Sequence, residues 1–151
     1  MSIQIEKVQF ATDELAKGLS QLLPQLSSTA PILSVDDVER LINSEAATLF
    51  VARDAGALVG TLTLIIFSIP TGRRAWIEDV VVDATARGRG VGEALTITAL
   101  NEAKARGART IDLTSRPARE AANALYQKVG FSLRDTNVYR LMVKADDDSD
   151  Q

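Results

Sequence analysis

The chain has 151 residues and a formal net charge of −3, from 17 Lys and Arg against 20 Asp and Glu. This length predicts one domain with a substantial core, and the near-balanced charge argues against a basic nucleic-acid-binding module. Cys and His are both absent, which excludes disulfides, thiolate zinc sites and Cys nucleophiles, and we predict no metal site. Acid–base chemistry must therefore use carboxylates, Tyr, Lys, a terminus or water.

No segment of the sequence predicts membrane insertion or export. The longest apolar stretch, residues 57–70, is interrupted by Gly60, Thr61, Thr63 and Ser68, and it is shorter than the ~20 residues of a membrane-spanning helix. The N-terminus lacks a basic segment followed by an apolar run, so no signal peptide is predicted. We expect a cytoplasmic protein with neither a membrane nor a nucleic acid as a partner.

The first half of the chain predicts a strand, two helices and three further strands. Residues 2–10 alternate apolar and polar side chains imperfectly, as in a strand. From Thr12, a suitable N-cap, leucines recur at helical spacing until Pro24 bends or ends the helix. Residues 34–37, Ser-Val-Asp-Asp, resemble a capping box that opens a second helix. Three strands follow, joined by short turns that favour antiparallel pairing, over residues 48–53, 58–69 and 75–82.

The second half alternates helices and strands. A glycine-rich stretch, residues 87–92, leads into a helix that ends near Gly107, and residues 110–114 predict a strand. Residues 117–129 predict a helix that a glycine stops, and residues 131–143 predict a last strand. The order is β-α-α-β-β-β-α-β-α-β, which indicates an α/β (α+β) fold.

The composition changes only near the C-terminus. We expect residues 1–144 to form a single domain without internal repeats. Residues 145–151 carry four aspartates and no apolar residue after Ala145. Such a segment has too little apolar surface to fold, so we predict an acidic disordered tail.

The glycine-rich turn Arg87-Gly88-Arg89-Gly90-Val91-Gly92 follows the apolar strand Val80-Val81-Val82 and opens a helix. Glycines let a pyrophosphate approach the backbone, free N–H groups at a helix start bind the anion, and the two arginines add donors. A dinucleotide fingerprint would need a small residue where Glu93 or Leu95 stands, and no P-loop sequence is present. On this pattern alone, a tight strand-to-helix turn without a ligand is an equal alternative.

Three sequence segments together resemble the GNAT N-acetyltransferase superfamily. Arg87, Gly90 and Gly92 match its acetyl-CoA-binding signature, Gln/Arg-x-x-Gly-x-Gly/Ala. Residues 76–83 look like the family's fourth strand, and residues 123–131, Asn-Ala-Leu-Tyr-Gln-Lys-Val-Gly-Phe, look like its later Asn, Tyr and Gly-Phe segment. The resemblance implies a GNAT fold, with a mixed, mostly antiparallel sheet of about six to seven strands and about four flanking helices.

The resemblance also implies acetyl-CoA as the cofactor and assigns residues to it. The backbone of residues 80–82, chiefly Val80 and Val82 around Val81, would pair with the pantetheine arm where the fourth and fifth strands splay apart. Asn123 would hydrogen-bond the cofactor near its pantetheine, and Tyr126 would lie close to the thioester sulfur. Backbone N–H groups would hold the pyrophosphate from Arg87, Gly88, Arg89, Gly90, Val91, Gly92 and Glu93.

Two side chains are candidates for the chemistry, because an amine must lose a proton and the leaving thiolate benefits from a donor. Tyr126, three positions after Asn123, lies on the same helix face and offers a neutral hydroxyl as donor, or else is a core residue with its tip in water. Glu78 is the candidate base, directly or through water, or else a strand residue that caps a backbone group or pairs with a neighbouring arginine. On a regular strand Glu78 shares its face with Val80, and Asp79 faces the other side unless a bulge intervenes.

The resemblance implies direct transfer of acetyl from acetyl-CoA to a primary amine of a small molecule or peptide, in a ternary complex. An acetyl-cysteine intermediate is impossible in a chain without Cys. The alternatives are a non-catalytic acyl-CoA-binding sensor and an enzyme that transfers a longer acyl group. The sequence Ile-Glu-Asp at residues 77–79 resembles the glucosamine-6-phosphate branch, but the acceptor stays open. By analogy with the family, a homodimer is a further expectation.

Overall fold

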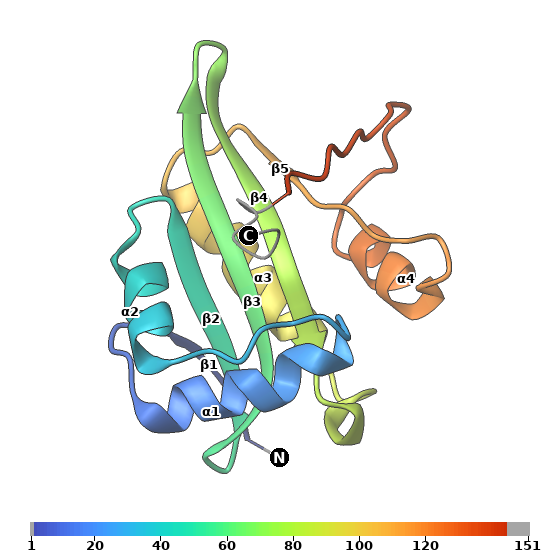
Figure 1. Cartoon of the computed structure of the whole chain (residues 1–151). Coiled ribbons are helices and arrows are strands. Elements are labelled where there is room, and N and C mark those ends of the chain that lie inside the picture. Colours follow the sequence, from blue (N-terminus) through green and yellow to red (C-terminus); the bar gives the residue numbers. More distant parts are fainter. Residues whose placement is uncertain (1, 145–151) are drawn as a thin grey trace.

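The protein folds around one five-stranded mixed sheet in strand order β1-β2-β3-β4-β5. The computed structural model describes residues 2–144, so the acidic tail predicted at 145–151 lies outside the described residues. Neighbouring strands from β1 to β4 are antiparallel, whereas β5 runs parallel to β4 (Figure 1). The strands are β1 Ile3–Lys7, β2 Ala47–Asp54, β3 Ala57–Ile69, β4 Gly72–Val82 and β5 Thr110–Asp112.

Helices cover both faces of the sheet. In Figure 1, α1 and α2 lie on one face, α3 lies on the other, and α4 lies beside the β5 edge. None of the helices in residues 2–144 is both long enough and apolar enough to cross a membrane. The helical segments are α1 Asp13–Leu22, η1 Leu23–Gln25, α2 Val35–Asn43, η2 Ala84–Ala86, α3 Val91–Ala105 and α4 Glu120–Lys128.

The predicted helix starts are confirmed by their capping hydrogen bonds. The Thr12 hydroxyl accepts a 3.1 Å bond from the Leu15 N–H at the start of α1. The Ser34 hydroxyl accepts from the Asp37 N–H, and the Asp37 carboxylate accepts from the Ser34 N–H, which completes the capping box of α2. Pro24 lies in η1, directly after α1 ends at Leu22.

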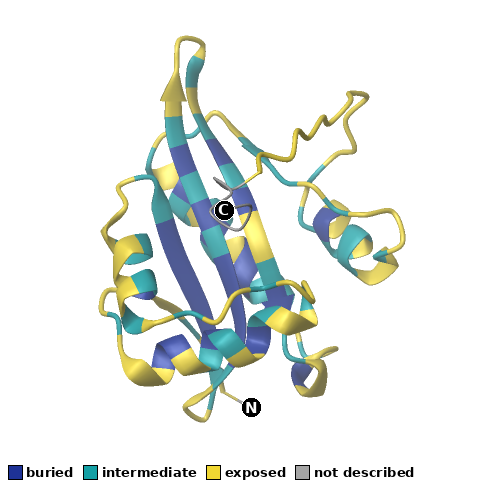
Figure 2. Ribbon diagram, in the orientation of Figure 1, coloured by how far each residue is buried: buried dark blue, intermediate teal, exposed yellow. Residues whose placement is uncertain are grey.

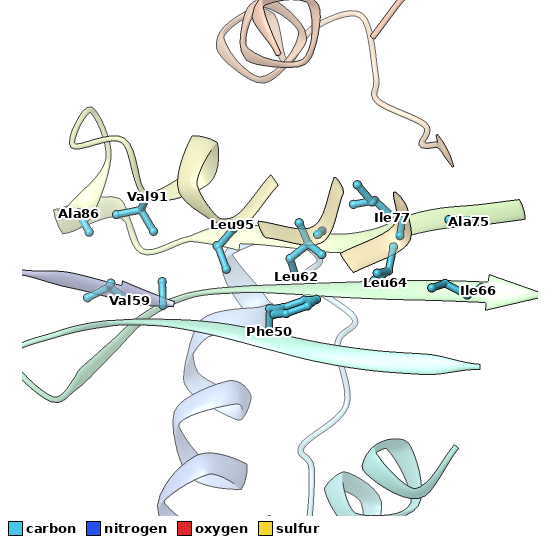
Figure 3. Packing of buried hydrophobic residues seen from close by; sticks show 13 residues of the cluster. Phe50, Val59, Leu62, Leu64, Ile66, Ala75, Ile77, Ala86, Val91 and Leu95 are labelled. Carbon is cyan, nitrogen blue, oxygen red and sulfur yellow. The ribbon is translucent and has the colours of Figure 1, made fainter. Parts of the chain in front are cut away.

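Two apolar clusters, one on each face, hold the layers together. Figure 2 shows the buried residues concentrated along the central strands. The cluster between the sheet and α3 is drawn in Figure 3, and its largest members include Phe50, Leu62, Leu64, Ile77 and Leu95. The cluster under α1 and α2 includes Leu15, Leu19, Val38, Leu49 and Val51. Burying each such side chain contributes about 1.5–3 kcal/mol, so the clusters fix where β4 and α3 lie.

The last predicted strand, residues 131–143, is wrong. This segment forms no strand, so the sheet has five strands rather than the six to seven expected. A strand needs a neighbouring edge for its hydrogen bonds, and the described part of β5 pairs only with β4. Figure 1 shows the segment leaving α4 and running outside the sheet. Its large apolar side chains are exposed at Leu133, Val138, Tyr139, Leu141, Met142 and Val143.

Candidate active site

A β-bulge in β4 shapes the site. Thr61 of β3 lies opposite Val81 of β4, whereas Thr63 lies opposite Glu78. An advance of two residues along β3 therefore corresponds to three residues along β4, so β4 has one extra residue. Asp79, inside this bulge, has a φ of +52°, a left-handed conformation that is uncommon for a residue with a side chain. The extra residue changes which way the side chains point along the rest of β4.

The bulge corrects two expectations about neighbouring side chains. Val80 packs against the same cluster as Ile77, three positions earlier, so it does not share a face with Glu78 as a regular strand would require. Glu78 and Asp79 line one cavity instead of facing opposite sides of the sheet. The structure therefore brings two adjacent carboxylates to the same site.

That cavity, the β4–β5 cavity, lies where β4 and β5 separate. The two strands pair only from Arg74 to Trp76 of β4, opposite residues 110–112. Beyond this short ladder a cavity of about 750 Å³ opens, lined by residues 77–80 of β4, the loop 113–119 and Tyr126 of α4. A second, outer cavity of about 710 Å³ lies on the other side of Tyr126, between β5, α4 and the segment 131–138. The predicted separation of the fourth and fifth strands is confirmed.

Tyr126 stands between these two cavities and is well positioned as a proton donor. Its side chain lines both cavities and the residue is only 6% exposed. The ring packs edge-on against Phe131, with centroids 5.9 Å apart. Burial raises the pKa of Tyr126, and the positive charge of Arg119 opposes that rise. The hydroxyl therefore remains protonated at neutral pH and can donate a hydrogen bond.

Glu78 is held in an environment that makes it a better base than an ordinary carboxylate. Partial burial raises its pKa most, the negative charge of Asp79 raises it further, and Arg140 opposes the rise. The pairing with Arg73 or Arg74 considered as an alternative is absent from the hydrogen bonds in residues 2–144. Arg73 instead donates to the Arg106 carbonyl at 2.7 Å, and Arg74 donates to the Thr71 hydroxyl.

The glycine-rich turn has the geometry of an anion site at the start of α3. Gly88 and Gly90 have φ values of +78° and +80°, and Gly90 is the N-cap of the helix. A Cβ at either position would meet no heavy atom within 4 Å, so the backbone conformation requires glycine and leaves open space above it. Gly92 has another role, because a Cβ there would lie 3.3 Å from Leu125 of α4.

The charged side chains of this turn interact with the protein itself. Arg89 forms a 2.7 Å ion pair with Asp54 at the end of β2, and Arg87 donates from Nε to the Val82 carbonyl. Each guanidinium thus has a partner within the protein, and the expectation that both groups add donors for a pyrophosphate stays a prediction. Glu93 pairs with Lys128 of α4 at 3.0 Å. The turn also offers an anion its backbone N–H groups.

Asn123 and Ser115 shape the loop between β5 and α4. The Asn123 side chain donates a 2.9 Å hydrogen bond to the Arg116 carbonyl. Asn123 lines the outer cavity, whereas Glu78 lines the β4–β5 cavity. Ser115 lines both cavities, and its buried hydroxyl has no partner among the described residues. A buried unpaired hydroxyl is costly unless a ligand satisfies it. No sequence signal marked Ser115.

These features fit acetyl-CoA. The open turn at Gly88 and Gly90, the stretch of β4 beyond its ladder with β5 and the unpaired Ser115 hydroxyl all offer polar groups to a ligand. Residues 2–144 contain no group of three carboxylates placed to hold a metal ion.

Comparison with known proteins identifies the family. The sequence model of the Acetyltransferase (GNAT) family matches residues 18–131. The chain belongs to this family. It is therefore an acetyltransferase with the mixed α+β GNAT fold, from a family whose enzymes use acetyl-CoA generally.

One relative and two solved structures of the same fold show what this chain is similar to. Glucosamine 6-phosphate N-acetyltransferase 1 of Oryza sativa subsp. japonica is 33% identical over 129 residues, which cover 78% of this chain and 75% of that protein. Glucosamine-6-phosphate N-acetyltransferase from Arabidopsis thaliana has a TM-score of 0.78 at 21% identity, covering 95% of this chain and 100% of that chain. An aminoglycoside acetyltransferase from an uncultured soil metagenomic sample has a TM-score of 0.81 at 18% identity, covering 95% and 97%.

Proposed function

We propose that this protein transfers the acetyl group of acetyl-CoA directly to a primary amine of a small molecule or peptide, within a ternary complex. One observation carries the proposal. Glu78, Asp79 and Tyr126 line a single cavity where β4 and β5 separate. A proton acceptor and a proton donor thus lie in one cavity, which is what attack by an amine on a thioester requires.

In this proposal the cofactor is held mainly by backbone. Bound acetyl-CoA would supply the activated acetyl thioester. Residues 80–82 would pair with the pantetheine arm, as an added strand pairs with a sheet edge. The N–H groups from Arg87 to Glu93, aided by the dipole of α3, would bind the pyrophosphate. Asn123 would hydrogen-bond the cofactor near its pantetheine, while its side-chain amide also fixes the loop that carries Ser115, which offers its hydroxyl to the ligand.

The protein's own groups then manage the protons. Glu78 accepts a proton from the incoming ammonium, directly or through a water molecule, and the raised pKa of its carboxyl favours this step. Tyr126 donates its hydroxyl proton toward the sulfur as the thiolate leaves. Since the chain has no Cys, no acetyl-cysteine intermediate forms and transfer is direct.

Glucosamine 6-phosphate is one candidate acceptor. The relatives from rice and Arabidopsis bear this name, and the sequence Ile-Glu-Asp in β4 of this chain resembles that branch of the family. Arg116, Arg119 and Arg140 line the β4–β5 cavity. Their positive charges suit an anionic group, which could be the phosphate of this acceptor or part of the cofactor.

A homodimer is the second part of the proposal. The six apolar side chains of the segment 131–143 are 71–94% exposed in the single chain. Covering them at about 100 Å² each in two copies buries on the order of 1,200 Å², which reaches the size of a stable interface. A second copy satisfies this requirement because each chain offers the same surface.

Calorimetry and product release together separate an enzyme from a sensor. We expect acetyl-CoA to bind, and free CoA to appear only when an amine acceptor is also present. The matched variant Tyr126→Phe should bind acetyl-CoA as the wild type does but release CoA more slowly. Binding with no release from any acceptor would favour the non-catalytic sensor instead.

A further inference from the structure

A third cavity opens beside the β4–β5 cavity. This leucine chamber lies between α1, α2 and the sheet and has a volume of about 370 Å³. The loop between η1 and α2, residues 26–33, forms one of its walls. Its apolar lining comes chiefly from Leu19, Leu23, Leu26, Leu33, Leu41 and Leu49.

The chamber is connected to the β4–β5 cavity. Leu26, Ser27 and Asp79 line both of them. Of the described residues that line the chamber, Asp79 alone carries a charge. The bulge in β4 places this carboxylate at the junction, beside Glu78. A ligand whose reacting end lies near Glu78 can therefore extend its other end into the chamber.

The chamber does not suit a sugar phosphate. The hydroxyl of Thr61, on its β3 wall, already donates a 2.9 Å bond to the Phe50 carbonyl. The polar side chains of the chamber are the hydroxyls of Ser27, Thr29, Thr61 and Thr63 and the carboxylate of Asp79. A phosphate placed there would lose water, find no cation in the lining and be repelled by Asp79, which is costly. An apolar group gains free energy there for the opposite reason. At about 30 Å³ per water-sized group, the volume accepts about twelve such groups.

We infer that the acceptor is a primary amine with an apolar body, whose ammonium pairs with Asp79 at the junction and whose alkyl chain or aromatic ring fills the leucine chamber. This inference rests on the proposed acetyltransferase function and specifies its acceptor. Asp79 orients the amine toward Glu78, and the leucines select against hydrated acceptors. The arginines of the β4–β5 cavity are then left for anionic parts of the cofactor.

A homologous series of linear amines tests the chamber. With CoA release as the readout, kcat/KM should rise about fourfold for each methylene from propylamine to hexylamine, because each added methylene is buried among the leucines. Each of these amines should exceed glucosamine 6-phosphate in kcat/KM. A flat series with turnover of glucosamine 6-phosphate would overturn this inference while leaving the proposed function intact. Release with neither the linear amines nor glucosamine 6-phosphate would overturn this inference, and silence with amino acids, polyamines, aminoglycosides and short peptides as well would overturn both.

Two variants locate the effect. Ala30→Phe, in the loop wall, should fill the chamber and lower kcat/KM for hexylamine at least tenfold, with propylamine turnover and acetyl-CoA affinity unchanged. The matched control is Ile32→Phe in the same loop, because Ile32 is 87% exposed and does not line the chamber. Asp79→Asn tolerates the positive φ and should raise KM for the amines more than it lowers kcat. Loss of a long-chain acyl-CoA preference in Ala30→Phe would assign the chamber to the acyl group instead.

Discussion

Substitution of Gly90 tests whether the turn before α3 binds the pyrophosphate. Gly90 has a φ of +80°, and a Cβ there meets no heavy atom within 4 Å. A side chain at this position therefore costs about 1–2 kcal/mol of stability through the backbone conformation, without a clash. Gly107, just beyond the other end of α3, has a φ of +84° and equally open surroundings. It supplies a matched control with the same backbone cost.

Gly90→Glu should abolish acetyl-CoA binding by charge repulsion. A carboxylate about 4 Å from one phosphate charge costs about 4 kcal/mol at an effective dielectric constant of about 20, which weakens binding about a thousandfold. At a hundredfold excess over Kd, acetyl-CoA should stabilise the wild type by about 2.7 kcal/mol. In a domain of this size that corresponds to a rise in Tm of about 5–10 °C.

Differential scanning fluorimetry with and without acetyl-CoA measures both effects. In the absence of ligand both variants should lose stability, Gly107→Glu more than Gly90→Glu, because the dipole of α3 favours a carboxylate at its N-terminus and disfavours one at its C-terminus. Only Gly107→Glu should keep the wild-type rise in Tm when acetyl-CoA is added. A full rise in Gly90→Glu would refute the reasoning, because the pyrophosphate would then bind elsewhere.

Four further variants have expected results. Tyr126→Phe should lower kcat about a hundredfold or more with the Kd for acetyl-CoA unchanged, and an unaltered kcat in steady-state assays would remove Tyr126 as the donor. Glu78→Gln should erase the rise of the pH–rate profile that follows deprotonation of this carboxyl; a wild-type profile would indicate that water or the amine itself manages the proton. The folded state raises the pKa of Glu78 above its ordinary 4.5, so the wild-type protein loses stability as pH rises through this raised pKa. Glu78→Gln removes that loss. The variant should therefore have a higher Tm than the wild type at pH 7 but not at pH 4. Leu95 of α3 is fully buried in the cluster between the sheet and α3. Leu95→Ala should therefore lower the free energy of unfolding, measured by urea denaturation, by about 2–5 kcal/mol. A smaller loss would mean that the cluster collapses around the gap. Light scattering should show a dimer that Leu133→Asp combined with Met142→Asp converts to a monomer; a monomeric wild type would contradict the proposed interface.

The parts of the fold that depend on local interactions could be predicted from the sequence. The caps at Thr12 and Ser34 involve residues three positions apart, so the pattern that encodes them is visible in a short window. The strands from β2 to β4 were predictable because tight turns join them. The prediction of a final strand was wrong because a strand also depends on a sheet edge that is free to pair with it in three dimensions. Residues 131–143 have no pairing with β5.

In the candidate site, too, the local features could be predicted from the sequence and the long-range contacts could not. The glycine turn and Tyr126 lie in short patterns that the family resemblance marks. The bulge that brings Asp79 beside Glu78 arises from the register between β3 and β4, which sequence alone does not reveal. The ion pair between Arg89 and Asp54 joins residues 35 positions apart, so this contact of a side chain in the glycine-rich turn could not be predicted from a short sequence pattern.

The most direct test of the proposed function is the release of CoA from acetyl-CoA across a panel of amines, followed with a thiol reagent. The panel would contain glucosamine 6-phosphate, alkylamines, amino acids, polyamines, aminoglycosides and short peptides. The chain has no Cys, so the protein itself adds no thiol to the signal. We predict amine-dependent release that Tyr126→Phe strongly reduces. Tight acetyl-CoA binding with no release above the rate without amine, across the whole panel, would contradict the proposed transfer.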